Sequence, residues 1–145
     1  MNRGESPPVG YYVTDYESEI RDVCAFLENQ GMRYRLINEF EIQYISDEVV
    51  IYIIFERNSD AVSVEYSLPS NPSEAATQTQ PETYSIGWTI AEYLDGKLKS
   101  KYLPEKLTKL EKIMGCVRFF QDYRSLLLDK EFANELRAKY DKLLI

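Results

Sequence analysis

The side chains of this chain best suited to chemistry are carboxylates that lie close together in the sequence. Glu39 and Glu41 are two residues apart, and Asp47 and Glu48 are adjacent. Such pairs can act as general acid and base, or they can hold a divalent cation. Residues i and i+2 of a strand, however, share a face at a separation of about 7 Å, and no third ligand follows at a suitable spacing. We therefore expect neither a catalytic pair nor a metal site here.

Other groups that usually carry catalysis are missing from the sequence. The chain contains no histidine, so it has no imidazole base, no imidazole metal ligand and no histidine pH switch. No GxSxG motif occurs, and the glycines are scattered rather than gathered in a phosphate-binding loop. We expect a protein that is not an enzyme and that uses no cofactor.

The strands that carry these carboxylates can be placed from the alternation of side chains. Apolar and polar residues alternate over 40–44 and 62–68, and 49–55 is a continuous apolar run typical of a central strand. A short fourth strand at 84–86 would extend the sheet. The sequence therefore predicts a three- to four-stranded antiparallel meander.

The lengths of the turns predict how the strands pair. A two-residue turn puts Tyr44 opposite Val49, and a four-residue turn puts Phe55 opposite Val62. Both registers gather apolar side chains on one shared face of the sheet. A slip of one residue in either hairpin would destroy this match, so the alternation of side chains specifies the pairing.

The opposite face of the sheet is the predicted site for binding another protein. The same registers place Glu41, Tyr52 and Glu65 in one row across it. An apolar and aromatic strip with carboxylates at its rim suits a basic protein partner. The predicted partner-binding residues are Glu39, Glu41, Gln43, Asp47, Glu48, Tyr52 and Glu65. One alternative stays open at this point, which is that the C-terminal helices cover the middle of this face.

Helices are predicted on both sides of the strand block. Thr14 and Glu17 have the spacing of a capping box, and Gly31 is placed to end the helix that follows. Later helices are expected to begin near Pro104 and at Asp129. We predict an α+β fold with an N-terminal helix, the antiparallel meander, and C-terminal helices packed on the sheet.

Composition and length predict how the chain is organised. We expect residues 1–10 to form a mobile tail and residues 11–145 to form a single α+β domain. Neither a signal peptide nor a membrane-spanning run is visible, so a cytoplasmic protein is expected. Cys24 and Cys116 fall in helical patterns and are expected to be buried apolar residues rather than a disulfide.

The charge of the chain is divided along its length. Residues 1–95 hold 17 acidic and 5 basic side chains, whereas residues 96–145 hold 7 acidic and 12 basic ones. This division favours electrostatic recognition of a partner, or attraction between the two parts. Acidic residues interrupt the basic segment, and the net charge of −7 repels phosphates, so we expect no nucleic-acid binding.

Three features together give the chain a likeness to a known class of protein. They are a first helix, a meander edged with Glu39, Glu41 and Glu65, and a helix junction in the sequence YRSLLLDKEF at 123–132. In these features the chain resembles small acidic bacterial immunity proteins of toxin systems. The resemblance implies binding to a cognate toxin, often a basic nuclease, whose active site or substrate path the immunity protein blocks. Binding residues differ between lineages of such proteins, so the resemblance assigns none here.

The expected function is therefore neutralisation of a protein partner, such as a basic toxin, through an acidic surface that contains tyrosine. Two alternatives stay open. The oppositely charged parts could pair between chains and make a self-associating subunit, such as a homodimer. The carboxylates could also serve an enzyme that works without histidine.

Overall fold

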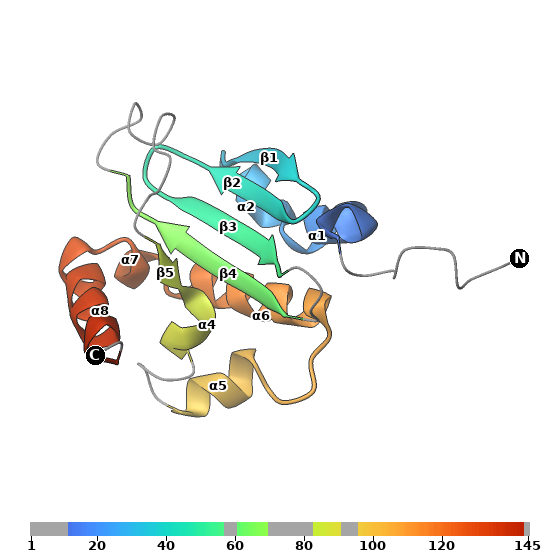
Figure 1. The fold of residues 1–145 in the computed structure, drawn as a ribbon. Helices are drawn as coiled ribbons and strands as arrows, with labels where there is room; N and C mark the ends of the chain where they lie inside the picture. The colour runs from blue at the N-terminus through green and yellow to red at the C-terminus, as the bar shows by residue number, and fades with distance from the viewer. Residues whose placement is uncertain (1–11, 57–60, 70–82, 91–95, 144–145) are drawn as a thin grey trace, which may run out of the picture.

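The computed structural model describes residues 12–56, 61–69, 83–90 and 96–143 (Figure 1). The predicted mobile tail at 1–10 lies outside these residues. Within the described parts, no helix is long and apolar enough to cross a membrane.

Helices and strands follow one another in an α+β order, which confirms the predicted fold class. The helical elements are η2 (Val13–Tyr16), α1 (Glu17–Val23), α2 (Ala25–Asn29), α4 (Ile86–Trp88), α5 (Gly96–Tyr102), α6 (Lys109–Asp122), α7 (Arg124–Leu127) and α8 (Lys130–Leu143). The strands are β1 (Arg33–Asn38), β2 (Glu41–Ile45), β3 (Val50–Phe55), β4 (Val62–Ser67) and β5 (Tyr84–Ser85). They form one antiparallel sheet in the order β1-β2-β3-β4-β5.

The N-terminal helix forms, but not from the predicted cap. Thr14 lies inside the 3₁₀ turn η2, whose N-cap is Tyr12, and the Asp15 carboxylate accepts a hydrogen bond from the Tyr12 backbone N–H at 3.3 Å. The helix is interrupted at Cys24, where φ is −102° and ψ is 11°. Gly31 ends it with φ of 93°, a conformation that glycine adopts without steric cost.

One of the two predicted hairpin registers is correct, and the other is displaced. Phe55 pairs with Val62 as predicted. Tyr44 pairs with Ile51 rather than with Val49, so the β2–β3 register differs from the prediction by two residues. The turn lies one residue later than predicted, because the Ser46 backbone N–H bonds the Val49 carbonyl at 3.0 Å and leaves Asp47 and Glu48 as the turn residues. A displacement of two residues keeps every side chain on its predicted face.

Strand β1 was not predicted, and it forms an edge of the sheet. Five of its six residues are exposed, and its register shifts between Leu36 and Asn38. Leu36 and Ile37 are adjacent and are 41% and 37% exposed. An edge strand with water on both faces has no clear alternation of apolar and polar residues, so the pattern that identifies inner strands fails here.

The described helices gather on one face of the sheet, with α1, α2 and α6 behind the strands in Figure 1. From this face the sheet contributes Ile42, Tyr44, Ile51, Ile53, Phe55, Val64 and Tyr66 to a core cluster that it shares with the helices. Val50 and Tyr52, on the other face, are buried but do not join this cluster. The C-terminal helices therefore pack on the predicted apolar face, and no described helix covers the other one.

The helix predicted to begin near Pro104 begins later in the structure. Pro104 belongs to a connector, and α6 starts at Lys109 after a capping box formed by Thr108 and Glu111. The Thr108 hydroxyl accepts from the Glu111 backbone N–H, and the Glu111 carboxylate accepts from the Thr108 backbone N–H. The prediction for the last helix is confirmed, because α8 starts at Lys130 and the Asp129 carboxylate accepts from the Glu131 backbone N–H.

Candidate protein-binding face

The face of the sheet that carries no described helix is here called the open face. Alternate residues of each strand lie on the same face, so the register defines its members. They are Arg33, Arg35, Glu41, Gln43, Ile45, Val50, Tyr52, Ile54, Ser63, Glu65, Ser67 and Ser85. Four of the seven predicted binding residues are in this set, namely Glu41, Gln43, Tyr52 and Glu65.

The predicted row across this face needs one correction. Gln43, not Glu41, lies directly opposite Tyr52 on β2, and Glu65 lies opposite Tyr52 on β4. Glu41 is instead opposite Ile54. The exchange follows directly from the two-residue displacement of the β2–β3 hairpin. Glu41 stays on its predicted face, but its partner on β3 is Ile54, the next residue on that face after Tyr52.

The other three predicted residues lie in turns. Glu39 is in the β1–β2 turn, where the Asn38 side chain accepts a hydrogen bond from the Phe40 backbone N–H at 2.8 Å. Asp47 and Glu48 are exposed in the β2–β3 turn. These turns lie at opposite ends of β2, so the structure does not bring the seven predicted residues into one cluster.

Both carboxylates of the open face are held by neighbouring side chains. The Gln43 side-chain amide donates to Glu41 Oε2 at 2.6 Å. Glu65 accepts from two hydroxyls, with Ser63 Oγ at 2.8 Å from Oε2 and Thr83 Oγ1 at 2.7 Å from Oε1. Acceptors fixed in this way lose little side-chain entropy when a partner binds. The charges of the open face are therefore preorganised.

Tyr52 forms the floor of the open face rather than a protruding anchor. Its ring is 9% exposed, and its hydroxyl is hydrogen-bonded to Ser67 Oγ at 2.8 Å. Burial raises the pKa of Tyr52, the Ser67 hydrogen bond lowers it, and the negative charges of Glu41 and Glu65 raise it further. The phenol is therefore neutral at physiological pH, and both carboxylates lie near enough to act on it.

The sequence prediction missed the basic side of this face. Arg33 and Arg35 are exposed on β1 and lie opposite Ile45 and Gln43. The open face thus runs from positive charge on the β1 edge to negative charge on β2 and β4. The alternation of arginines in Arg33-Tyr34-Arg35 was the available signal, but it needed β1 to be recognised first.

Three basic side chains of the C-terminal part contact rings and neutral oxygens of the acidic part. Lys109 lies over the Phe55 ring, with Nζ 4.7 Å from its centroid, and Arg124 donates to Gln30 Oε1 at 3.4 Å. Arg137 lies over the Tyr84 ring and donates to the Thr83 carbonyl. Between described residues, the ion pair that forms is Arg21–Glu28 at 2.6 Å, within the acidic part.

The cysteine and acidic side chains decide whether the protein could hold a metal ion. Of those the structure describes, no group of three or more histidine, cysteine, aspartate or glutamate side chains lies close enough to hold a metal ion. Cys24 and Cys116 are free and buried, as expected from the sequence. The chemistry that the open face offers is hydrogen-bond acceptance by two fixed carboxylates beside a tyrosine.

Comparison with protein-family models, with curated proteins and with solved structures finds no match to this chain.

Proposed function

We propose that this protein binds a basic protein partner through the open face of its sheet and neutralises that partner by covering its functional surface. The observation that carries the proposal is the pair of fixed carboxylates, Glu41 and Glu65, near the nearly buried Tyr52. The division of charge in the sequence supports it, since residues 1–95 are strongly acidic. Inhibition of this kind is also what the resemblance to immunity proteins implies.

Physical chemistry explains why such a face suits a basic partner. Carboxylates that are already oriented can accept charge-assisted hydrogen bonds from arginine or lysine without first being ordered. Val50 and Tyr52 are already buried beneath these carboxylates, and this apolar floor keeps the local dielectric low. The acidic charge would also speed the approach of a basic partner, and this effect would weaken as salt rises.

The test begins with capture of partners from host lysate and continues with the purified complex. The variant Glu41→Lys/Glu65→Lys should lower the association rate by about tenfold or more at low salt, since charge complementarity acts mainly on that rate. The loss should shrink at high salt. Association kinetics of the purified pair at two ionic strengths provide the measurement.

A matched control separates the effect of charge on the open face from the effect of the protein's net charge. Glu19→Lys/Asp22→Lys makes the same change in net charge on α1, where both side chains are exposed away from the sheet. This control should bind almost as the unmodified protein does. A folded Glu41→Lys/Glu65→Lys protein that binds its partner at the normal rate would show that another surface is used.

Self-association is the second candidate function, and the charge gradient of the open face supports it. A two-fold axis between two open faces would place Arg33 and Arg35 of one copy near Glu41 and Glu65 of the other. Light scattering should then show a dimer that Arg33→Glu/Arg35→Glu converts to a monomer.

A further inference from the structure

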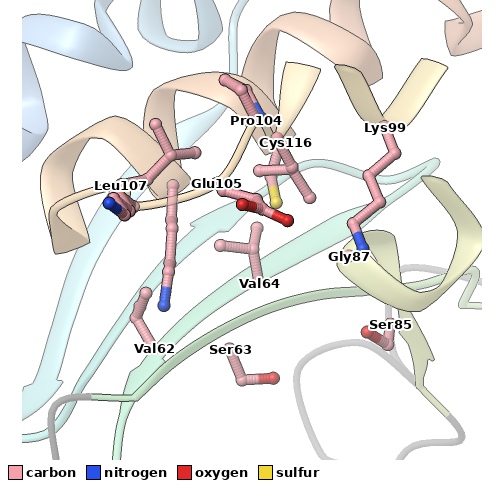
Figure 2. A pocket seen from close by; sticks show the side chains of 13 residues that line it. Val62, Ser63, Val64, Ser85, Gly87, Lys99, Pro104, Glu105, Leu107 and Cys116 are labelled. Atoms are coloured by element: carbon pink, nitrogen blue, oxygen red, sulfur yellow. The ribbon is translucent and has the colours of Figure 1, made fainter. Parts of the chain in front are cut away.

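A pocket of about 360 Å³ lies beside β4 on the helix-covered side of the sheet. Its apolar wall is formed by Val62, Val64, Leu103, Leu107 and Cys116. Figure 2 shows Val62 and Val64 pointing from the strand toward the connector between α5 and α6, while Ser63 points away from them. The pocket therefore lies mainly on the helix-covered side of β4, and Ser63 and Ser85 of the open face complete its edge.

The rim of this pocket is mainly basic. Lys99, Lys106 and Lys112 line it, against a single carboxylate from Glu105. In Figure 2 the Lys99 side chain runs from α5 into the pocket toward Gly87, and the Glu105 carboxylate lies in its middle. An apolar wall below several ammonium groups is complementary to a molecule with an apolar body and one negative end.

The positive charge of Lys112 acts on Cys116, which is part of the apolar wall. Burial raises the pKa of the Cys116 thiol to about 12, and the positive charge of Lys112 acts in the opposite direction. The thiol is therefore neutral at physiological pH and contributes to the wall as an apolar group. Lys112 lies close enough to influence a negative group that enters beside Cys116.

The backbone at Lys106 carries a second sign that this rim is specialised. Its φ is 63°, in the left-handed region, although the residue is not glycine. A residue with a Cβ adopts this region much less readily than glycine, so the conformation is held by its surroundings. Strain of this kind concentrates at functional sites, and here it places a lysine on the pocket rim.

We infer that this pocket binds a small amphipathic carboxylate, with its apolar body against Val64 and Cys116 and its negative group among Lys99, Lys106 and Lys112. A water molecule occupies about 30 Å³ in the liquid, so the pocket has room for about a dozen water-sized groups. A chain of about eight carbons fits this volume. Glu105 would then act as a resident negative group that the ligand's carboxylate displaces.

The test uses three probes that share one alkyl chain and differ only in the end group, namely octanoate, octan-1-ol and octylamine. Amide chemical shifts of the full-length protein are followed during titration. Octanoate should shift the amides of Val62, Val64 and Cys116, with a dissociation constant on the order of 1 mM or tighter. Octanol should bind several-fold more weakly, and octylamine should bind more weakly still.

Charge variants sharpen the assignment. Lys99→Gln/Lys112→Gln should weaken octanoate binding by roughly tenfold, as expected for two partly exposed charges, without changing the affinity for octanol. Glu105→Gln should tighten octanoate binding several-fold because it removes the competing carboxylate. Arg118→Gln/Lys130→Gln removes the same charge from exposed positions outside the pocket and should leave the affinity unchanged.

The variant Lys106→Gly separates binding from folding. Glycine relieves the left-handed backbone, so the protein should stay folded and at least equally stable, while octanoate binds several-fold more weakly. Equal affinity for octanoate and octanol, or octanoate shifts that map away from β4 and α6, would overturn the inference. The proposed protein partner is tested at Glu41 and Glu65, which do not line the pocket, so either proposal can fail without the other.

Discussion

The two faces of the sheet carry similar apolar residues on β3 but differ on the strands beside it. Toward the helices, β2 and β4 contribute Ile42, Tyr44, Val64 and Tyr66, whereas toward the open face they contribute Glu41, Gln43 and Glu65. The central strand is apolar on both sides because it is buried on both sides. The difference teaches that the flanking strands, not the central one, decide which face the helices cover.

The two faces also differ in whether their polar side chains have hydrogen-bond partners. On the open face the Tyr52 hydroxyl bonds Ser67, and both carboxylates have donors. On the covered face the Tyr66 hydroxyl is buried and has no hydrogen-bond partner among the described residues. The covered side is therefore organised by close packing, and the open side by hydrogen bonds. Three predictions test this contrast, and we take the largest expected effect first.

Gly115→Ala should be the most damaging small change on the covered side. A Cβ at Gly115 would lie 2.0 Å from the Tyr102 carbonyl oxygen, which is backbone and cannot move aside easily. We expect a loss of about 3 kcal/mol in the free energy of unfolding, measured by urea denaturation.

Gly87→Ala provides the matched control, since its Cβ would meet only Ser85 Oγ at 3.9 Å. Its effect on stability should stay within about 0.5 kcal/mol. Equal effects of the two substitutions would show that the contact between α6 and the end of α5 is looser than the structure indicates.

These packing contacts also mark the limit of what the sequence could predict. The apolar run at 49–55 and the alternation over 62–68 were enough for the fold class and the β3–β4 register, because both signals are local. The β2–β3 register depended on Ser46, whose hydroxyl and backbone both bond Val49 and so move the turn one residue along the chain. A hydrogen bond of this kind leaves no pattern in the sequence.

For the candidate sites too, local patterns could be predicted from the sequence and contacts between distant segments could not. Four open-face residues were identified because a two-residue error in register preserves the faces of the strands. Arg33 and Arg35 were missed together with their edge strand. The pocket could not be predicted at all, since it joins β4 to Lys99 and Cys116, which are far away in the sequence. Close approach of distant segments is a property of packing rather than of spacing.

Alkaline pH should weaken the covered side more than the open side. Burial raises the pKa values of Cys24 and Cys116 to about 12. A cysteine in the unfolded chain loses its proton near pH 8.5, so the folded state binds more protons above that pH. The stability these thiols contribute is complete below about pH 8.5 and is lost as pH rises toward about 12.

The slope should approach about 1.4 kcal/mol per pH unit for each buried thiol. Urea midpoints at pH 7, 9 and 10 under reducing conditions measure it. Cys24→Ala and Cys116→Ala should each flatten the slope. Tyr52→Phe, on the open face, should change the slope much less, because an unfolded tyrosine loses its proton only near pH 10. An equal slope in all three variants would contradict the assignment to the thiols.

The smallest effect compares one buried tyrosine hydroxyl from each face of the sheet. Tyr66→Phe removes a hydroxyl that has no partner among the described residues, so stability should rise by up to about 1 kcal/mol. Tyr52→Phe removes the hydrogen bond to Ser67, whose hydroxyl then has lost its partner in a residue that is only 4% exposed. The free energy of unfolding should therefore fall by about 1 kcal/mol. Urea denaturation of both variants gives the sign of each change in the free energy of unfolding.

A double-mutant cycle makes the open-face half of this prediction specific to the hydrogen bond. Ser67→Ala alone should cost about as much as Tyr52→Phe, because each leaves one buried hydroxyl without its partner. The double variant removes both hydroxyls and should therefore lose less than the sum of the two single changes. Additive losses would mean that Tyr52 and Ser67 do not depend on each other, and the open face would then be held by packing, as the covered face is.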